Sequence, residues 1–158
     1  MAKMLGDSRY LRTTAVHVKP GQVAAFENLL KDLKTAREKT SPPQTTLVSQ
    51  AVAGQEGTVF YVTVLQSSLA GFDKLPTTQQ TLGDEGYAKF LKINADVVEN
   101  TETVINRFLP ELSNAPEEVA AIAPEYWAPK MAVAKAGTAK SPAVNAAETT
   151  KMNDKDKH

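Results

Sequence analysis

A single histidine lies inside a run of β-branched residues near the start of this 158-residue chain. His17 stands between Val16 and Val18 in "TTAVHVK", and Pro20-Gly21 follows directly. An imidazole titrates near neutral pH, so in a dry cavity His17 can serve as a general base or orient a ligand. The alternative is a structural role, in which the ring is hydrogen-bonded to a neighbouring Thr, Ser or Tyr. We favour the structural role and retain His17 as the candidate catalytic residue.

Arg107 and its neighbour Asn106 stand in a segment that we expect to be a strand, so they lie on opposite faces of the sheet. Whichever points away from the helices would line one cavity with three other residues: His17, Tyr61 and Thr63. An arginine there can hold a carboxylate or an enolate oxygen. A structural ion pair of Arg107 with Glu102 or Glu111 is the alternative, and we favour it. The ligand-binding candidates from the sheet are therefore Tyr61, Thr63 and Arg107.

Two adjacent aromatic residues, Tyr126 and Trp127, follow the predicted sheet in "PEYWAP". Such rings can cover a pocket, because they offer a large apolar area with one polar atom. They can equally form a C-terminal clasp that packs on the chain's own helices or on a partner, and we favour the clasp. Trp127 is kept as a candidate ligand contact.

The composition excludes several kinds of site. The chain has no cysteine, so disulfides, thiolate zinc sites and cysteine nucleophiles are ruled out. Its two histidines are His17 and His158, so a multi-histidine metal site would need a second chain, and we predict neither metal nor cofactor. Basic and acidic residues number 18 each, which gives no indication of a nucleic-acid partner. No apolar run is long enough for a membrane helix, and "MAKMLGDSRY" lacks the apolar centre of a secretory signal. We expect a cytoplasmic protein, although an export signal could have been removed.

The first half of the chain alternates strand and helix signals. Residues 11–19 are rich in Thr and Val and predict a strand, which Pro20-Gly21 ends. Apolar residues then recur at helical spacing, which predicts a helix over residues 21–39. Residues 45–52 and 58–66 predict two further strands, and the short glycine-containing turn between them indicates an antiparallel hairpin.

The second half repeats the pattern with weaker signals. Residues 67–75 predict one or two helical turns, and residues 77–83 ("TTQQTLG") predict a loop. Helical spacing of apolar residues over 84–100 predicts the second long helix, whose acidic first turn suits the helix dipole. Residues 101–109 begin with β-branched residues and predict a fourth strand, although they can also continue the helix. Pro110 ends this segment.

The chain therefore divides into four parts. Residues 1–9 are expected to be a flexible N-terminus, and residues 10–110 form the folded domain. Residues 111–130 are a C-terminal extension with a short helix and the aromatic clasp. Residues 131–158 contain no aromatic residue and too little apolar surface to offset their ordering entropy, so we expect a disordered tail.

The order strand–helix–strand–strand–helix–strand is that of the α+β ferredoxin-like fold, βαββαβ. In that fold a four-stranded antiparallel sheet carries both helices on one face and leaves the other face bare. The strand over residues 58–66 is apolar on both of its faces, so both faces need cover. A symmetric homodimer whose two sheets face each other would provide it.

The segments "VHVKPGQVAAFENLL" and "VLQSSLAGFDKL" resemble the dimeric α/β-barrel superfamily, which includes antibiotic-biosynthesis-monooxygenase-like domains. Shared features are a first strand that runs through a Pro-Gly turn into a helix with an early Phe, and a Ser-containing turn after the third strand. The resemblance covers roughly residues 10–110. "RFLPELSNAPE" and "PEYWAPK" also resemble the ending of an uncharacterised bacterial branch of proteins of this shape.

The resemblance implies a dimeric α/β barrel and leaves three functions open. The first is a homodimeric module that binds a small hydrophobic or aromatic molecule, or has a structural role, without turnover; we favour it. The second is a cofactor-independent monooxygenase-like enzyme for a planar phenolic or quinone-like compound, with His17 or a tyrosine as the base. The third is haem handling, which in this superfamily needs a histidine on the second helix. Residues 84–100 contain none, so haem handling is the least favoured.

Overall fold

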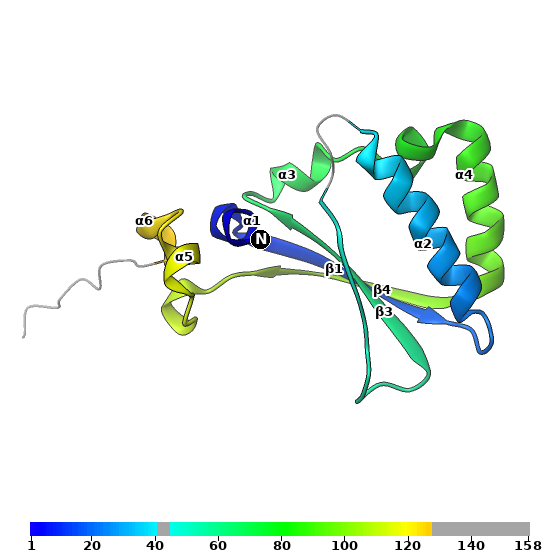
Figure 1. The fold of residues 1–158 in the computed structure, drawn as a ribbon, viewed down its shortest axis with the longest axis horizontal. Helices are drawn as coiled ribbons and strands as arrows, with labels where there is room; N and C mark the ends of the chain where they lie inside the picture. Colours follow the sequence, from blue (N-terminus) through cyan, green and yellow to red (C-terminus); the bar gives the residue numbers. More distant parts are fainter. Residues whose placement is uncertain (41–44, 128–158) are drawn as a thin grey trace, which may run out of the picture.

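A computed structural model describes residues 1–40 and 45–127 of the chain. Its four strands pair antiparallel in the order β2-β3-β1-β4, and the two long helices follow β1 and β3 (Figure 1). This is the predicted α+β ferredoxin-like arrangement, which is confirmed. The main elements are β1 (Tyr10–Val18), α2 (Val23–Glu38), β2 (Leu47–Gln50), β3 (Thr58–Gln66), α4 (Thr78–Val97) and β4 (Val98–Arg107).

Shorter helices flank this core. They are α1 (Ala2–Asp7), α3 (Ala70–Asp73), the 3-10 turn η1 (Pro110–Leu112), α5 (Glu117–Ala120) and α6 (Pro124–Trp127). Figure 1 shows α2 and α4 side by side over one part of the sheet, whereas α1, α5 and α6 gather at its other end. The part of the chain that the structure describes contains no helix long and apolar enough to cross a membrane.

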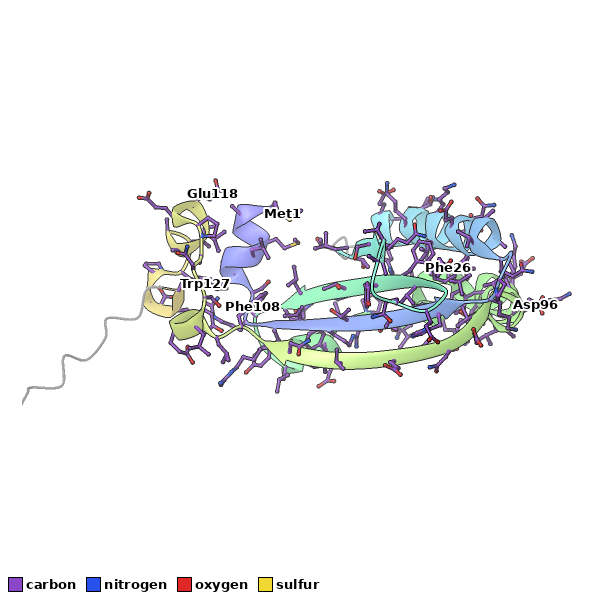
Figure 2. All side chains as sticks on the ribbon, turned by 90° about the horizontal axis from the view of Figure 1, so that it is seen from below. Met1, Phe26, Asp96, Phe108, Glu118 and Trp127 are labelled. Atoms are coloured by element: carbon purple, nitrogen blue, oxygen red, sulfur yellow. The ribbon has the colours of Figure 1, made fainter. Side chains whose placement is uncertain are left out.

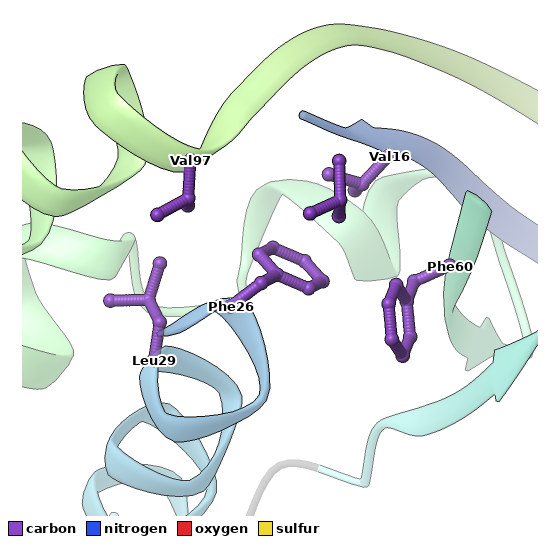
Figure 3. Packing of buried hydrophobic residues seen from close by; sticks show 6 residues of the cluster. Val16, Phe26, Leu29, Phe60 and Val97 are labelled. Atoms are coloured by element: carbon purple, nitrogen blue, oxygen red, sulfur yellow. The ribbon is translucent and has the colours of Figure 1, made fainter. Parts of the chain in front are cut away.

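The main hydrophobic core lies between α2 and the two central strands. Val16 and Val18 of β1 point to the same side as Phe60 of β3, because Val16 pairs directly with Phe60. Phe26 of α2 lies in the middle of the cluster, with its ring centroid 5.0 Å from that of Phe60 (Figure 3). Alternation along the strands thus buries the face that was expected to lie under the helices.

The prediction of a loop over residues 77–83 is wrong, because α4 already begins at Thr78. Thr77 caps the helix: its hydroxyl accepts from the Gln80 backbone N–H, while the Gln80 side chain accepts from the Thr77 backbone N–H. Gly83 then adopts φ 72° and ψ 172°, so the helical path is broken by a kink at that residue. Gly83 was predicted to be part of a loop, whereas in the structure it joins two helical segments.

β4 begins at Val98, directly after α4, and all its residues after Val98 are exposed. It pairs only with β1 and therefore forms one edge of the sheet. A strand was predicted over residues 101–109, and β4 confirms it. The observed strand begins at Val98, three residues earlier than predicted.

The N-terminus is helical where residues 1–9 were expected to be flexible. α1 packs on α5, and a second hydrophobic cluster forms around Val119, Ala123 and Trp127. Gly6 is buried in this contact. A Cβ at that position would lie only 2.6 Å from Cβ of Ile122, so a larger residue does not fit. The glycine allows α1 and the segment around Ile122 to approach closely. The predicted tail over residues 131–158 lies outside the described residues.

Candidate functional site

His17, Tyr61 and Thr63 share the sheet face opposite the helices, which we call the open face. Ala15 pairs with Tyr61, and Thr13 pairs with Thr63 through hydroxyl oxygens 3.0 Å apart. All three candidates are half-buried. His17 lies between Val59 and Asn100, and its imidazole forms no hydrogen bond within residues 1–40 and 45–127. The sheet thus brings these three residues to one face, without the hydrogen bond that the structural role supposed for His17.

Arg107 does not join them. Arg107 pairs with Tyr10, so its side chain belongs to the helix-covered face of the sheet. Asn106 pairs with Leu11 and belongs to the open face. Arg107 is exposed, and no ion pair with Glu102 or Glu111 occurs in the described part of the chain. Of these two neighbours, Asn106 is therefore the one that shares the open face with His17, Tyr61 and Thr63.

Trp127 lies at the other end of the molecule from the main core (Figure 2). Its side chain is buried, and its Nε1 donates a hydrogen bond to the Gly6 carbonyl oxygen at 2.9 Å. Its ring is tilted against Phe108 with centroids 5.4 Å apart. These contacts are those of the predicted clasp, which packs on the chain's own N-terminal helix. They place Trp127 away from the other candidates.

A cavity of about 210 Å³ lies between the helices and the sheet, and we call it the apolar cavity. Most of its wall is apolar, and it is lined by Thr14, Val16, Phe26, Leu29, Leu30, Leu33, Arg37, Val62, Thr78, Phe90, Asn94 and Thr101. None of the sheet candidates from the sequence analysis (His17, Tyr61, Thr63 and Arg107) is among these residues. The cavity is on the opposite face from the one expected.

Five elements build the apolar cavity. α2 contributes a stripe at helical spacing, from Phe26 through Leu33 to Arg37. α4 contributes Phe90 and Asn94, one turn apart. The sheet provides the floor with residues of β1, β3 and β4, among them Thr14, whose hydroxyl oxygen lies 2.9 Å from that of Thr103. A few polar groups thus converge on an apolar space, as in many small-molecule sites.

A second cavity of about 330 Å³ adjoins the first, and we call it the arginine cavity. It is lined by Arg12, Arg37, Phe72, Asp73, Leu75, Pro76, Thr77, Thr78 and Thr81. The two cavities share Arg37 and Thr78 in their linings. An apolar group in the first cavity and a polar group in the second would both lie beside these two side chains.

The two arginines give the arginine cavity a positive character. Nη1 of Arg37 donates a hydrogen bond to the Thr46 hydroxyl at 3.3 Å, and the Arg12 guanidinium carbon lies 5.1 Å from the Phe72 ring centroid. Burial lowers the pKa of Arg37 below its ordinary value, and the nearby charge of Arg12 adds to that shift. Both effects show that the folded chain disfavours the positive charge of Arg37.

Arg12 and Arg37 were not among the residues predicted from the sequence, although the sequence contains a signal for both. Arg12 is an even number of residues from Val16 and Val18 along β1, as Thr14 is, so its side chain lies on the same sheet face as these buried valines. Arg37 continues the α2 stripe four residues after Leu33. A charged residue in phase with a core face needs a partner or a cavity. That signal points to the helix side of the sheet.

The apolar cavity is lined by aliphatic, aromatic, hydroxyl, amide and guanidinium side chains. The described residues that line it include no histidine, carboxylate, tyrosine or lysine, so none exchanges a proton readily near neutral pH. No group of three or more Asp, Glu or His within the described ranges is placed to hold a metal ion. The wall can contact an apolar body and offer hydroxyl and amide hydrogen bonds.

No protein-family model matches the chain, and no curated protein matches its sequence. Solved structures do resemble it. A candidate antibiotic biosynthesis monooxygenase from Bordetella bronchiseptica is 10% identical with a TM-score of 0.46, and the match covers 65% of this chain and 98% of that chain. A conserved protein from Methanosarcina mazei is 20% identical with a TM-score of 0.46, covering 66% of this chain and 97% of that chain.

A dimeric ferredoxin-like protein of unknown function from Thermobifida fusca is 12% identical with a TM-score of 0.42, covering 64% of this chain and 92% of that chain.

Proposed function

We propose that this chain is a homodimeric binding protein for a small, mainly apolar molecule. The observation that supports the proposal is the apolar cavity between the helices and the sheet, with an apolar wall and the polar groups of Thr14, Asn94 and Thr101. Its volume of about 210 Å³ is below that of a typical drug-sized site, but the adjoining cavity extends the space.

The open face has a different role in this proposal, as the surface that meets a second copy of the chain. Leu11, Leu65 and Tyr61 place apolar surface there, and Val104 of β4 is 56% exposed on the same face. Such a face is seldom left in water. We assign His17 and Thr63 to this interface, so His17→Gln leaves ligand binding unchanged.

The monooxygenase-like alternative needs a base beside the substrate. His17 and Tyr61 lie on the open face, on the other side of the sheet from the apolar cavity. A general base must come within hydrogen-bond reach of the proton that it removes. We therefore propose binding without turnover as the function that the site supports best.

The proposal is tested by filling the apolar cavity. Val62 lines it from β3, and Val62→Phe adds several carbon atoms to that wall. Cinnamamide, a flat neutral compound, serves as the probe in calorimetry, and native mass spectrometry of the freshly purified full chain detects a retained ligand. We expect Val62→Phe to abolish both signals while the unfolding temperature shows that the variant is folded, since overpacking costs about 1–3 kcal/mol.

The matched control is Val52→Phe, because Val52 is 98% exposed and lines none of the cavities described above. It should bind cinnamamide as the parent does. If the parent neither retains a ligand nor binds the neutral probe, the proposed function is wrong. If Val62→Phe binds as the parent does, the site lies elsewhere.

A further inference from the structure

Two guanidinium groups from separate elements line one cavity. Arg12 stands on β1, paired with Val64 and Ile105, and its side chain belongs to the helix side of the sheet. Arg37 stands in the last turn of α2. Both line the arginine cavity, and both are half-buried. Their charges are close enough for Arg12 to disfavour the charge on Arg37.

Neither arginine has a carboxylate partner within the described ranges. The ion pairs found there are Arg9 with Glu125 and Lys34 with Glu38. Asp73 lines the same cavity, but it is exposed and forms no ion pair with either arginine. Arg37 donates one hydrogen bond, to Thr46, so most of its five N–H donors remain for another acceptor.

A structural role explains only part of this arrangement. A cation in the last turn of a helix stabilises the helix dipole, which accounts for Arg37. Arg12 is on a strand, and its contact with the Phe72 ring at 5.1 Å leaves the charge itself without a counter-ion in the described part of the chain. Two half-buried like charges repel each other, and one anion between them would favour both.

The position of the pair relative to the apolar cavity indicates what the anion belongs to. Arg37 and Thr78 line both cavities, so an acidic group held by the arginines is within reach of the apolar wall. A free inorganic ion would use only the arginine cavity. A small organic acid would use both, with its body among the apolar residues and its oxygens at the guanidinium groups.

We propose that the ligand of this site is a small carboxylic acid with a flat apolar body, whose carboxylate is bound jointly by Arg12 and Arg37. This inference rests on the proposed function, since it names the chemical class of the molecule that the apolar cavity takes. It also assigns the specificity of the site for acids to the two arginines that bind the charged end of the ligand.

A matched pair of probes separates the inference from the function beneath it. Cinnamate and cinnamamide share one flat body and differ in the charge of the end group. In calorimetry with the full chain, we expect cinnamate to bind at least about tenfold more tightly than cinnamamide, because hydrogen bonds to charged groups contribute that much or more. Salt should weaken the binding of cinnamate and leave that of cinnamamide unchanged.

Three variants complete the experiment. Arg12→Gln should remove the preference for cinnamate while cinnamamide binds as before, because Arg12 lines the arginine cavity and not the apolar cavity. Arg37 lines both cavities, so for Arg37→Gln the expected result is loss of the preference, measured as the ratio of the two affinities. Lys92→Gln, at an exposed position of α4 that lines neither cavity, removes the same charge and should keep the preference. If either arginine variant does not fold, Arg12→Lys or Arg37→Lys replaces it: the charge stays, the paired N–H donors are lost and the preference should fall.

The outcomes are distinct. Equal affinity of the parent for both probes, or a preference that survives both arginine variants, overturns the inference and leaves the proposed function standing. Binding of neither probe overturns the proposed function and the inference with it. Binding of inorganic phosphate at the same affinity as cinnamate would show a general anion site and also overturn the assignment to an apolar acid.

Discussion

At the scale of single residues, Gly6 determines how closely α1 packs against the segment around Ile122. It lies in α1, where alanine would ordinarily be the better helix former by about 1 kcal/mol. The available space disfavours alanine, because a Cβ would meet three side-chain atoms of Ile122 at 2.6–2.9 Å. The Gly6 carbonyl also accepts the hydrogen bond from Trp127. Packing therefore outweighs helix propensity at this position.

We expect Gly6→Ala to lower the free energy of unfolding by about 1–3 kcal/mol, because the overpacked contact has to open. Urea unfolding followed by tryptophan fluorescence measures it, since the chain's one tryptophan lies in this contact. Lys3→Ala, at an exposed position of the same helix, is the control and should be close to neutral. Gly6→Ala with stability equal to that of the control would show that α1 does not dock as described.

Tyr126 makes the same contact sensitive to pH. Its hydroxyl donates a hydrogen bond to the Phe108 carbonyl oxygen at 2.7 Å. Burial raises the pKa of this phenol above its ordinary value of about 10, although the charges of Arg9 and Arg107 oppose the shift. The folded chain thus holds the phenolic proton more tightly than the unfolded chain does. The stability that this proton contributes is complete below pH 10 and is lost as the pH rises through the folded pKa.

We expect Tyr126→Phe to be less stable than the parent near neutral pH, by about 0.5–1.5 kcal/mol for the lost hydrogen bond. The difference should shrink at alkaline pH, because the parent phenol then ionises and also loses the bond. Urea unfolding at a series of pH values measures it. Tyr87→Phe is the control, and its difference from the parent should not follow this trend. A gap for Tyr126→Phe that stays constant with pH would contradict the account.

At the scale of elements, the break in α4 is the feature that shapes the site. Gly83 has φ 72° and ψ 172°, a backbone region that is essentially restricted to glycine. The segment before it carries Thr78, which lines both cavities, and the segment after it carries Phe90 and Asn94. One glycine therefore allows α4 both to cover the sheet and to turn towards the arginine cavity.

We expect Gly83→Ala to lower the free energy of unfolding by about 1–3 kcal/mol, because a Cβ is strained in that conformation. It should also weaken probe binding, since the segment with Thr78 is repositioned. Gly86→Ala is the control in the same helix: its φ is not positive, and its Cβ would meet the Leu82 Cβ at 3.1 Å, so a small shift suffices. Stability and binding equal to those of the parent in Gly83→Ala would show that the kink is not required.

The elements themselves could be predicted from local patterns, and the position of the site could not. Alternation in β1 and helical spacing in α2 predict both the elements and their buried faces, because those patterns depend on near neighbours in the chain. The capped segment from Thr78 was missed, because Thr-rich sequence before a glycine is also typical of loops. The helix at Ala2–Asp7 was missed because its stability comes from contacts with α5, more than 100 residues away along the chain.

The candidate site shows the same limit. Tyr61 and Thr63 were correctly placed on one face with His17, since alternation along strands determines that. Which of the two faces holds a cavity depends on how α2 and α4 fit over the sheet, and that is a property of packing. Arg12 and Arg37 meet only after β1 and α2 are brought together, so neither sequence segment alone indicates an anion site.

At the scale of the whole molecule, the chain has two unequal sheet faces. One carries the core and the cavities under the helices, and the other has half-buried residues such as Leu65 and Tyr61. Val59 is the exception on the open face, since it is fully buried within one copy. The terminal cluster around Trp127 lies at the far end of the sheet from Phe26 (Figure 2). A second copy placed on the open face would leave the cavities on the outer side of each sheet.

The homodimer is tested by placing a charge in the middle of the open face. Tyr61→Lys would bury an ammonium group between the two sheets at a cost of several kcal/mol, so we expect the parent to sediment as a dimer and the variant as a monomer. Val52→Lys, at a fully solvated loop position, adds the same charge and should remain dimeric. Because the cavities lie on the helix side, monomeric Tyr61→Lys should still bind cinnamamide. A parent that sediments as a monomer, or a Tyr61→Lys variant that stays dimeric, would show that the open face is not the dimer interface.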